Sequence, residues 1–176
     1  CEEACPAHLK ISDYVQAIYE GNSEESIRII YEDNPLPSIC GRICMKHCED
    51  ACSLGHRGEP VAIRWLKRYA ADNVASFDDA VRAKPGTPTG KKVAIIGAGA
   101  SGLSVAYFLR LAGHAITIFD SLPAPGGALR IGPPRYRLPE EALDRDTNYI
   151  ASLGVEFRLN TTVGEDIQFE DILRDY

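Results

Sequence analysis

The sequence lacks the features that mark several classes of protein. It has no apolar run near the ~20 residues that a membrane-spanning helix needs. Its first residues are acidic and contain no apolar stretch of the kind found in signal peptides. Basic residues are not in excess, and the formal net charge of −6 argues against nucleic acid as the main partner. These absences predict a cytoplasmic protein with no membrane span and no nucleic-acid partner.

Cysteine is missing from most of the chain. No cysteine follows Cys52 in this sequence of 176 residues, so the N-terminal third has a chemistry of its own. An even number of cysteines would suit disulfides in a secreted protein, but the sequence has no sign of secretion. In a reducing compartment, clustered cysteines more often bind metal. The candidate metal ligands are Cys1, Cys5, Cys40, Cys44, Cys48 and Cys52.

A starting methionine is missing too, because the chain begins at Cys1. It ends at Tyr176, after only a few strands of what reads as a larger α/β domain. The length suits one or two domains. We therefore expect a fragment of a longer protein that is not active alone.

Residues 1–83 read as helices separated by cysteine-bearing loops. Ser12 suits the N-cap of a first helix and Gly21 its stop. After the cysteine-rich stretch, Pro60 suits the first helical position of a further helix. The aromatic residues of that helix that we expect in the core are Trp65 and Tyr69.

A linker is expected at residues 84–90, which contain prolines and glycines but no large apolar side chain. Beyond it, residues 91–176 alternate between strand and helix patterns. The expected strands are 93–96, 115–119 and 155–159, and the expected helices are 103–112 and 138–153. By composition, 93–96 is a buried parallel strand. The predicted fold class is therefore an α-helical domain followed by an α/β Rossmann-like domain that is truncated.

A glycine-rich segment follows the first expected strand of this second domain and opens its first helix. It matches G-x-G-x-x-G, and the strand–turn–helix context makes that match specific. Gly97 permits the tight turn, Gly99 lets a pyrophosphate approach the backbone, and Gly102 lets the helix pack closely on the strand. The helix N-terminus adds free N–H groups and partial positive charge for the phosphates. The predicted dinucleotide-binding residues of this turn are Gly97, Ala98, Gly99, Ala100, Ser101 and Gly102.

Asp120 ends the second expected strand, where a carboxylate accepts hydrogen bonds from ribose hydroxyls. Its charge would repel a 2′-phosphate, which disfavours NADP at this site. A glycine pair, Gly126-Gly127, and an arginine-bearing loop at 130–137 follow closely. These segments suit a long, doubly charged cofactor that lies extended over the sheet. They favour FAD without excluding NAD.

The cysteine spacing favours iron–sulfur clusters. The last four cysteines recur every four residues and would drift by about 40° per step on one helix, so turns, short helices and divided centres are expected. This spacing is not typical of zinc but does not exclude it. Cys1-x₃-Cys5-Pro6 equals the end of the run C-x₂-C-x₂-C-x₃-C-P, whose last cysteine ligates a different cluster. Zinc and metal-free structural cysteines remain the alternatives.

Several segments in combination carry a family resemblance that covers nearly the whole chain. They are Cys1-x₃-Cys5-Pro6, Asn34-Pro35, Cys40-Gly41-Arg42-Ile43-Cys44, Cys48-Glu49-x₂-Cys52, Val61-Ala62-Ile63, Gly90-Lys91-Lys92-Val93, the glycine-rich turn, Gly126-Gly127 and Arg137-Leu138-Pro139. The chain resembles the small (β) subunit of NADPH-dependent glutamate synthase. It is similar also to the N-terminal region of dihydropyrimidine dehydrogenase and to related iron–sulfur flavoprotein subunits.

The resemblance implies two [4Fe-4S] clusters in an all-helical domain. It implies that one cluster is ligated by Cys5, Cys44 and Cys48. Cys1 and Cys52 would ligate the other, whose remaining ligands would precede this chain. Some members have an amide or carboxylate ligand at the place of Lys67, a cation that does not readily serve, and Cys40 is the substitute that we predict.

The resemblance also implies an FAD domain interrupted by an NAD(P)H domain that is missing from this chain. For FAD, the matching positions are the glycine-rich turn, Asp120, Gly126, Gly127, Arg137 and the backbone near Val163. Asp120 stands where Glu is more usual, which keeps the charge and shortens the reach. Pro133-Pro134 stands where Ile-Pro is common, so the contacts of that loop are less defined.

Two functions follow from these patterns. The first is an electron-transfer subunit of an NAD(P)H-dependent oxidoreductase, in which electrons pass through FAD and [4Fe-4S] clusters to a larger catalytic subunit or domain. No acid, base or nucleophile in this chain is then expected to be catalytic. The second is a non-redox module, in which a zinc-stapled helical domain is joined to an NAD-binding domain and acts as a sensor or scaffold.

Overall fold

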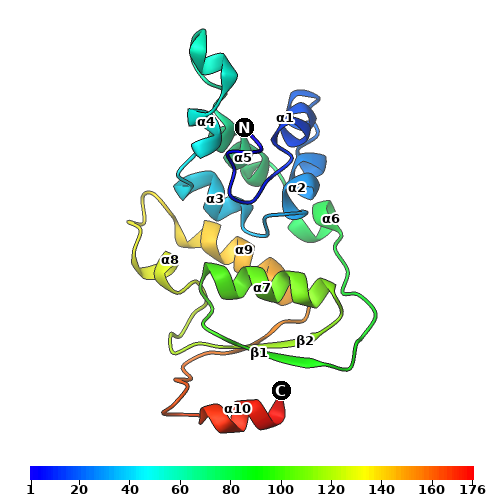
Figure 1. Ribbon diagram of the computed structural model, residues 1–176, viewed down its shortest axis with the longest axis vertical. Coiled ribbons are helices and arrows are strands. Elements are labelled where there is room, and N and C mark those ends of the chain that lie inside the picture. Colours follow the sequence, from blue (N-terminus) through cyan, green and yellow to red (C-terminus); the bar gives the residue numbers. More distant parts are fainter. The chain divides into compact units, whose positions relative to one another are not determined.

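The computed structural model describes residues 1–176 and divides them into two compact units, Cys1–Arg82 and Ala83–Tyr176 (Figure 1). The first unit is helical. Its elements are α1 (Ile11–Tyr19), α2 (Ser23–Tyr31), α3 (Pro37–Ile43), α4 (His47–Asp50), the 3₁₀ turn η1 (Ser53–His56), α5 (Ile63–Asp72) and α6 (Phe77–Val81). None of the helices in the structure has the length and apolar character needed to cross a membrane.

The helix ends of the first unit follow local side-chain chemistry. Asn22 caps α2 by accepting a hydrogen bond from the Glu25 N–H at 3.0 Å. Gly21 follows α1 with a positive φ of 78°, which confirms it as the stop of that helix. The predicted cap at Ser12 is wrong, because α1 already begins at Ile11. Pro60 also lies ahead of α5 rather than at its first position, since that helix begins at Ile63.

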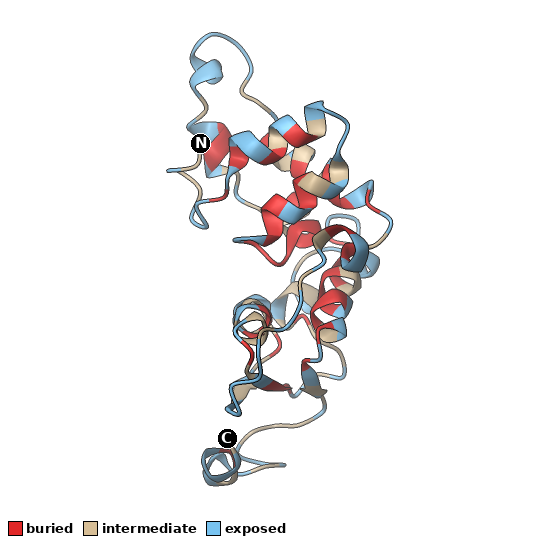
Figure 2. Ribbon diagram, turned by 90° about the vertical axis from the view of Figure 1, so that its right-hand side faces the viewer, coloured by how far each residue is buried: buried red, intermediate tan, exposed pale blue.

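The core of the first unit lies between its helices, where the buried positions face one another (Figure 2). The fully buried side chains include Tyr14, Ile27, Ile30 and Tyr31, and Phe77 packs edge-on against Tyr31. The prediction that Trp65 and Tyr69 lie in this core is wrong, since they are 55% and 51% exposed. Helix α5 instead turns inward the face that carries Ile63, Lys67, Ala70 and Ala71.

Helices α3 and α5 approach closely at a glycine. A Cβ added at Gly41 would lie 2.8 Å from the Cα of Arg68, so only glycine fits there without a shift of backbone. Beside this contact, Arg42 pairs with Asp72 at 2.7 Å. This packing explains why glycine and arginine follow Cys40 in the sequence.

The second unit is an α/β layer structure with a parallel sheet in the order β1-β2-β3. Its elements are β1 (Lys92–Ile96), α7 (Ala100–Leu111), β2 (Ala115–Phe119), α8 (Ala128–Ile131), α9 (Glu140–Ser152), β3 (Glu156–Arg158) and α10 (Phe169–Asp175). Helices α7 and α9 lie on one side of the sheet and α10 on the other (Figure 1). This arrangement confirms the predicted Rossmann-like class, and Gly113 and Gly154 end their helices with positive φ as expected.

The strands differ in burial. Strand β2 is buried along four of its five positions, as expected for the centre of a parallel sheet. The prediction that 93–96 is buried is wrong, because β1 is half-buried and Ile96 is 55% exposed. Strand β1 pairs with β2 on one side only, so it is an edge strand of this sheet.

Candidate functional site

The glycine-rich turn joins the end of β1 to the start of α7. Gly97 has a φ of 99°, and its N–H donates to the Phe119 carbonyl at 2.7 Å. A Cβ at Gly102 would lie 2.0 Å from the carbonyl oxygen of Gly97 and 3.2 Å from the Ile95 side chain. Glycine is therefore required at Gly102 for the first turn of α7 to lie against the loop and the strand.

Space is left open above the middle of this turn. A Cβ at Gly99 would meet no atom within 4 Å, so the backbone there is accessible to a bound group. Ala100 and Ser101 are exposed in the first turn of α7. Their position at the N-terminus of a helix suits a phosphate.

The second glycine pair packs against the same turn. The Gly126 N–H donates to the Ala98 carbonyl at 2.8 Å. A Cβ at Gly127 would lie 3.0 Å from the Gly99 Cα, so a side chain would crowd the turn from that side. The structure thus brings together two glycine segments that lie far apart in the sequence, and they form one cradle.

Asp120 holds the backbone of the glycine-rich turn by hydrogen bonds. Its carboxylate accepts hydrogen bonds from the Ala98 N–H at 2.6 Å and from the Leu122 N–H at 2.8 Å. It is only 9% exposed. Sequence reasoning predicted a contact to ribose but missed these backbone bonds. Each carboxylate oxygen retains further acceptor capacity, so a ribose hydroxyl can still be bound.

A cleft of about 230 Å³ opens at the carboxyl ends of the strands, where dinucleotides bind in such sheets. It is lined by Ile96, Gly97, Phe119, Asp120, Ser121, Thr161, Thr162 and Val163. The predicted residues Gly97, Asp120 and Val163 therefore meet in one cleft. Thr161 and Thr162 were missed, although their place after the last strand was the available signal.

Arg137 does not line this cleft. It is exposed, and its N–H donates to the Pro134 carbonyl at 2.8 Å. The neighbouring Arg130 is held instead by the Pro125 carbonyl at 2.7 Å and by Asp144. The Arg130 side chain thus holds the residue before the glycine pair, whereas no hydrogen bond from the Arg137 side chain is seen in the structure.

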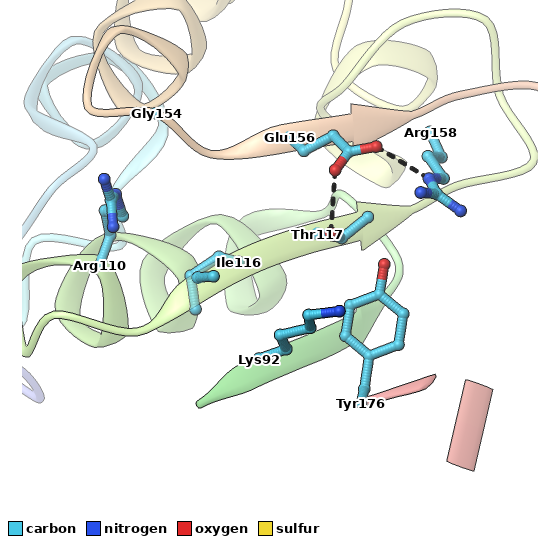
Figure 3. A pocket seen from close by; sticks show the side chains of 9 residues that line it. Lys92, Arg110, Ile116, Thr117, Gly154, Glu156, Arg158 and Tyr176 are labelled. Atoms are coloured by element: carbon cyan, nitrogen blue, oxygen red, sulfur yellow. Dashed lines mark hydrogen bonds and ion pairs between the residues drawn. The ribbon is translucent and has the colours of Figure 1, made fainter. Parts of the chain in front are cut away.

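Another cavity of about 310 Å³ lies beside the sheet (Figure 3). Glu156 in its wall pairs with Arg158 at 2.9 Å and accepts a hydrogen bond from Thr117 at 3.3 Å. Lys92 and Ala115, at the amino ends of β1 and β2, also line it. Since dinucleotides bind at carboxyl ends, this cavity is not the cofactor site.

In the first unit, three cysteines lie near one buried tyrosine, Tyr14. Burial raises the pKa of the Tyr14 hydroxyl, and the nearby side chains of Cys48, Cys5, Cys44 and Glu49 add to that effect. Burial likewise raises the pKa of the Cys48 thiol, while the cation of Lys67 opposes this rise. Cys5, Cys44 and Cys48 therefore share one locality, as expected for ligands of one cluster.

The buried Tyr14 hydroxyl has no hydrogen-bond partner in the structure. An orphaned buried donor is costly unless it finds an acceptor. The sulfur atoms of an iron–sulfur cluster held by Cys5, Cys44 and Cys48 would supply one. The residues present therefore fit such a cluster.

No three cysteine, histidine, aspartate or glutamate side chains close around a single metal ion in the structure. A [4Fe-4S] cluster binds each cysteine through a different iron atom, so its ligands need not meet at one point. Glu49, which is buried, accepts a hydrogen bond from the Arg64 N–H at 2.8 Å and ties this region to α5. Sequence reasoning gave Tyr14 and Glu49 no part in this site.

The other three cysteines, Cys1, Cys40 and Cys52, have different surroundings. Cys40 lies in α3, and its sulfur lies 3.7 Å from the Asn34 Oδ1. Cys1 is exposed. Backbone hydrogen bonds from Val61, Leu54 and Gly55 lower the pKa of Cys52, which favours a thiolate there.

The chain matches two family models. Residues 1–78 match dihydropyrimidine dehydrogenase domain II, 4Fe-4S cluster, and residues 95–161 match the NAD(P)-binding Rossmann-like domain. The first model covers the cysteine region, and the second covers the glycine cradle. The chain is similar over its whole length to the glutamate synthase small chain. The predicted order, an iron–sulfur domain followed by a Rossmann-like domain, is confirmed, and this favours the oxidoreductase interpretation over the zinc-stapled scaffold.

Curated relatives align with the whole chain. It is 42% identical to the NADP(+)-dependent formate dehydrogenase subunit beta of Moorella thermoacetica, of which it covers 28%. It is 40% identical to the NADPH-Fe(3+) oxidoreductase subunit beta of Geobacter sulfurreducens, covering 26%. It is 37% identical to the glutamate synthase [NADPH] small chain of Escherichia coli, covering 38%. The chain thus spans well under half the length of these relatives.

Proposed function

We propose that this chain forms the FAD- and cluster-binding part of an electron-transfer subunit in an NAD(P)H-dependent oxidoreductase. The observation that carries the proposal is the presence, in one chain, of a glycine cradle and a group of three buried or half-buried cysteines around Tyr14. When bound, FAD would exchange a hydride with NAD(P)H, and [4Fe-4S] clusters would carry single electrons. The chain's own part is to hold these groups in place.

For FAD, the cradle would hold the pyrophosphate at Gly99 and at the start of α7, because the backbone is open there. The cleft between Gly97, Asp120 and Val163 would take the adenosine part. Asp120 would both brace the turn and accept a ribose hydroxyl. Gly126 and Gly127 would keep the cradle free of side chains.

For the clusters, Cys5, Cys44 and Cys48 would ligate one [4Fe-4S] centre, with Cys40 as its fourth ligand. In the structure the Cys40 sulfur lies 3.7 Å from the Asn34 Oδ1, a weak contact that ligation could replace. Cys1 and Cys52 would ligate a second centre together with residues outside this chain. The reducing conditions of the cytoplasm suit such free thiols.

A larger protein is needed for the whole reaction. The relatives are two to four times as long as this chain, and the nicotinamide domain that the resemblance implies lies outside it. A larger subunit or domain would accept the electrons. On this proposal, the 176 residues alone would hold cofactor incompletely and would not be active.

The test is the colour and content of the natural full-length protein after anaerobic purification. We expect flavin absorption bands on a broad iron–sulfur absorbance, FAD released on denaturation, and iron and sulfide in equal amounts. Alanine at Cys44 should lower the iron content and leave the FAD content unchanged. A colourless protein with stoichiometric zinc would contradict the proposal and support the non-redox scaffold.

A further inference from the structure

Lys67 is a buried cation on the inward face of α5. Its exposed fraction is 6%, and its Nζ lies 6.0 Å from the centre of the Tyr14 ring. Lysine is almost never buried without a partner for its charge, because removing an ammonium group from water is expensive. We therefore expect a negatively charged group near the Lys67 ammonium.

Lys67 forms no ion pair with a carboxylate in the structure, although the buried Glu49 acts on the same Tyr14 and Cys48 side chains. Glu49, the buried acid of this region, pairs with Lys46 at 3.4 Å and accepts a hydrogen bond from the Arg64 N–H at 2.8 Å. What does lie beside α5 is the cysteine region, because the Arg64 guanidinium, one turn before Lys67, donates to the Cys44 carbonyl at 3.4 Å. In keeping with this, the cation of Lys67 acts to lower the pKa of Cys48. The cysteine side chains act also on Tyr14, over whose ring the ammonium lies.

We propose that Lys67 is a built-in counter-charge for the cluster at Cys5, Cys44 and Cys48, and that its ammonium raises the reduction potential of that cluster. This inference rests on the proposed function, since it needs the cluster. A cluster held by thiolates carries net negative charge, and reduction adds one more electron to it. A fixed cation beside the cluster stabilises the reduced form more than the oxidised form.

In this role Lys67 is a positioning and tuning residue, and it does not ligate iron. Its ammonium would donate toward sulfur, while the cysteines would bind the metal. The low dielectric of the buried site makes the effect of its charge large. An exposed lysine of the same unit, such as Lys10 in its pair with Glu32, would have little effect because solvent screens it.

The test measures the cluster potential in the natural full-length holoprotein by redox titration followed with electron paramagnetic resonance. For Lys67→Met we expect about a tenfold lower ratio of reduced to oxidised cluster at a fixed potential, which is about 59 mV for a one-electron couple. Lys67→Arg keeps the charge and should stay near the wild type. Lys10→Met is the matched control and should not shift the potential. An unchanged potential in Lys67→Met with full iron content would overturn the inference.

A second measurement uses the wild-type protein, so it does not depend on a variant that folds. The protein is labelled with ¹⁵N-lysine, reduced, and studied by pulsed electron paramagnetic resonance. We expect a weak coupling to one ¹⁵N nucleus that disappears in Lys67→Arg. A strong coupling would identify a nitrogen bonded to iron, and no coupling would place Lys67 too far away; either result overturns the inference. Absence of iron and sulfide from the wild type would instead overturn the proposed function itself, and this inference with it.

Discussion

The glycine cradle of the second unit and the cysteine group of the first are built in different ways. The cradle is a matter of backbone geometry: Gly97 needs its positive φ, and Gly102 needs the absence of a Cβ. The cysteine group depends instead on side chains brought together from the N-terminal segment, the end of α3 and α4. Local sequence therefore specifies the glycine cradle almost completely and the cysteine group only in part.

The two units differ also in what stands behind each site. Asp120 braces the cradle through two backbone N–H groups, so both of its carboxylate oxygens already have a partner in the protein. Behind the cysteines, the Tyr14 hydroxyl is unpaired and Lys67 lacks a carboxylate. The first unit thus contains buried polar groups that a bound cluster could satisfy, whereas the second unit has a preformed cleft.

The largest expected effect breaks the cradle. In Gly102→Ala, the new methyl group would lie 2.0 Å from the Gly97 carbonyl oxygen, so the turn and α7 must separate. We expect a loss of about 3 kcal/mol or more in the free energy of unfolding, together with loss of FAD. Urea unfolding followed by circular dichroism would measure the first effect and released flavin the second.

Gly99→Ala is the matched control for that change. Its Cβ meets no protein atom, and the Gly99 φ of −77° is ordinary for alanine. Stability should stay within about 0.5 kcal/mol of the wild type. FAD binding should still weaken, because the methyl group would occupy the approach to the backbone. Equal stability losses in the two variants would contradict the geometry described for the turn.

The next effect concerns Asp120. In Asp120→Asn, one of the two oxygens becomes an NH₂ group that faces a backbone N–H of Ala98 or Leu122. One charge-assisted hydrogen bond is lost and a buried donor is left unpaired, which costs about 2 kcal/mol. Urea unfolding would show this loss in protein that contains no FAD. If Asp120 acts only on ribose, the cofactor-free protein should be unaffected.

A smaller effect tests the helical unit by the same kind of substitution. In Gly41→Ala, the methyl group would lie 2.8 Å from the Arg68 Cα, so α3 and α5 must move apart slightly. We expect a loss of about 1–2 kcal/mol, because two helices can shift more easily than a tight turn. Gly58→Ala, where a Cβ meets nothing within 4 Å, is the control. Unfolding followed by the fluorescence of Trp65 reports on this unit.

Features that depend on neighbouring residues in the sequence were mostly predicted correctly, and features that depend on tertiary contacts were predicted less well. Strand β2 was predicted at its observed bounds, and the glycine stops at 21, 113 and 154 were all correct, because these depend on neighbours in the sequence. Burial was harder to predict. Trp65 and Tyr69 were expected inside because they are aromatic, but α5 turns its Lys67 face inward.

Sites made by tertiary contacts could be predicted only in part. The backbone bonds of Asp120 depend on how β2 ends beside the turn, and no residue pattern encodes them. Likewise, cysteine spacing indicated divided centres but could not identify Tyr14 as the side chain at the middle of one group. The spacing of Lys67 was the available signal that this lysine is buried, because Ile63, Lys67 and Ala70 lie on one face of α5.

The smallest expected effect distinguishes an empty cysteine group from a filled one. Burial raises the pKa of Tyr14, so its hydroxyl keeps its proton at neutral pH and remains a donor. In cluster-free protein, Tyr14→Phe removes an unpaired buried hydroxyl and should be neutral or stabilising by up to about 1 kcal/mol. In cluster-loaded protein the same change removes an O–H···S hydrogen bond and should be destabilising. Thermal unfolding of both forms under anaerobic conditions would measure the two shifts, and shifts of the same sign and size would mean that Tyr14 does not face the cluster.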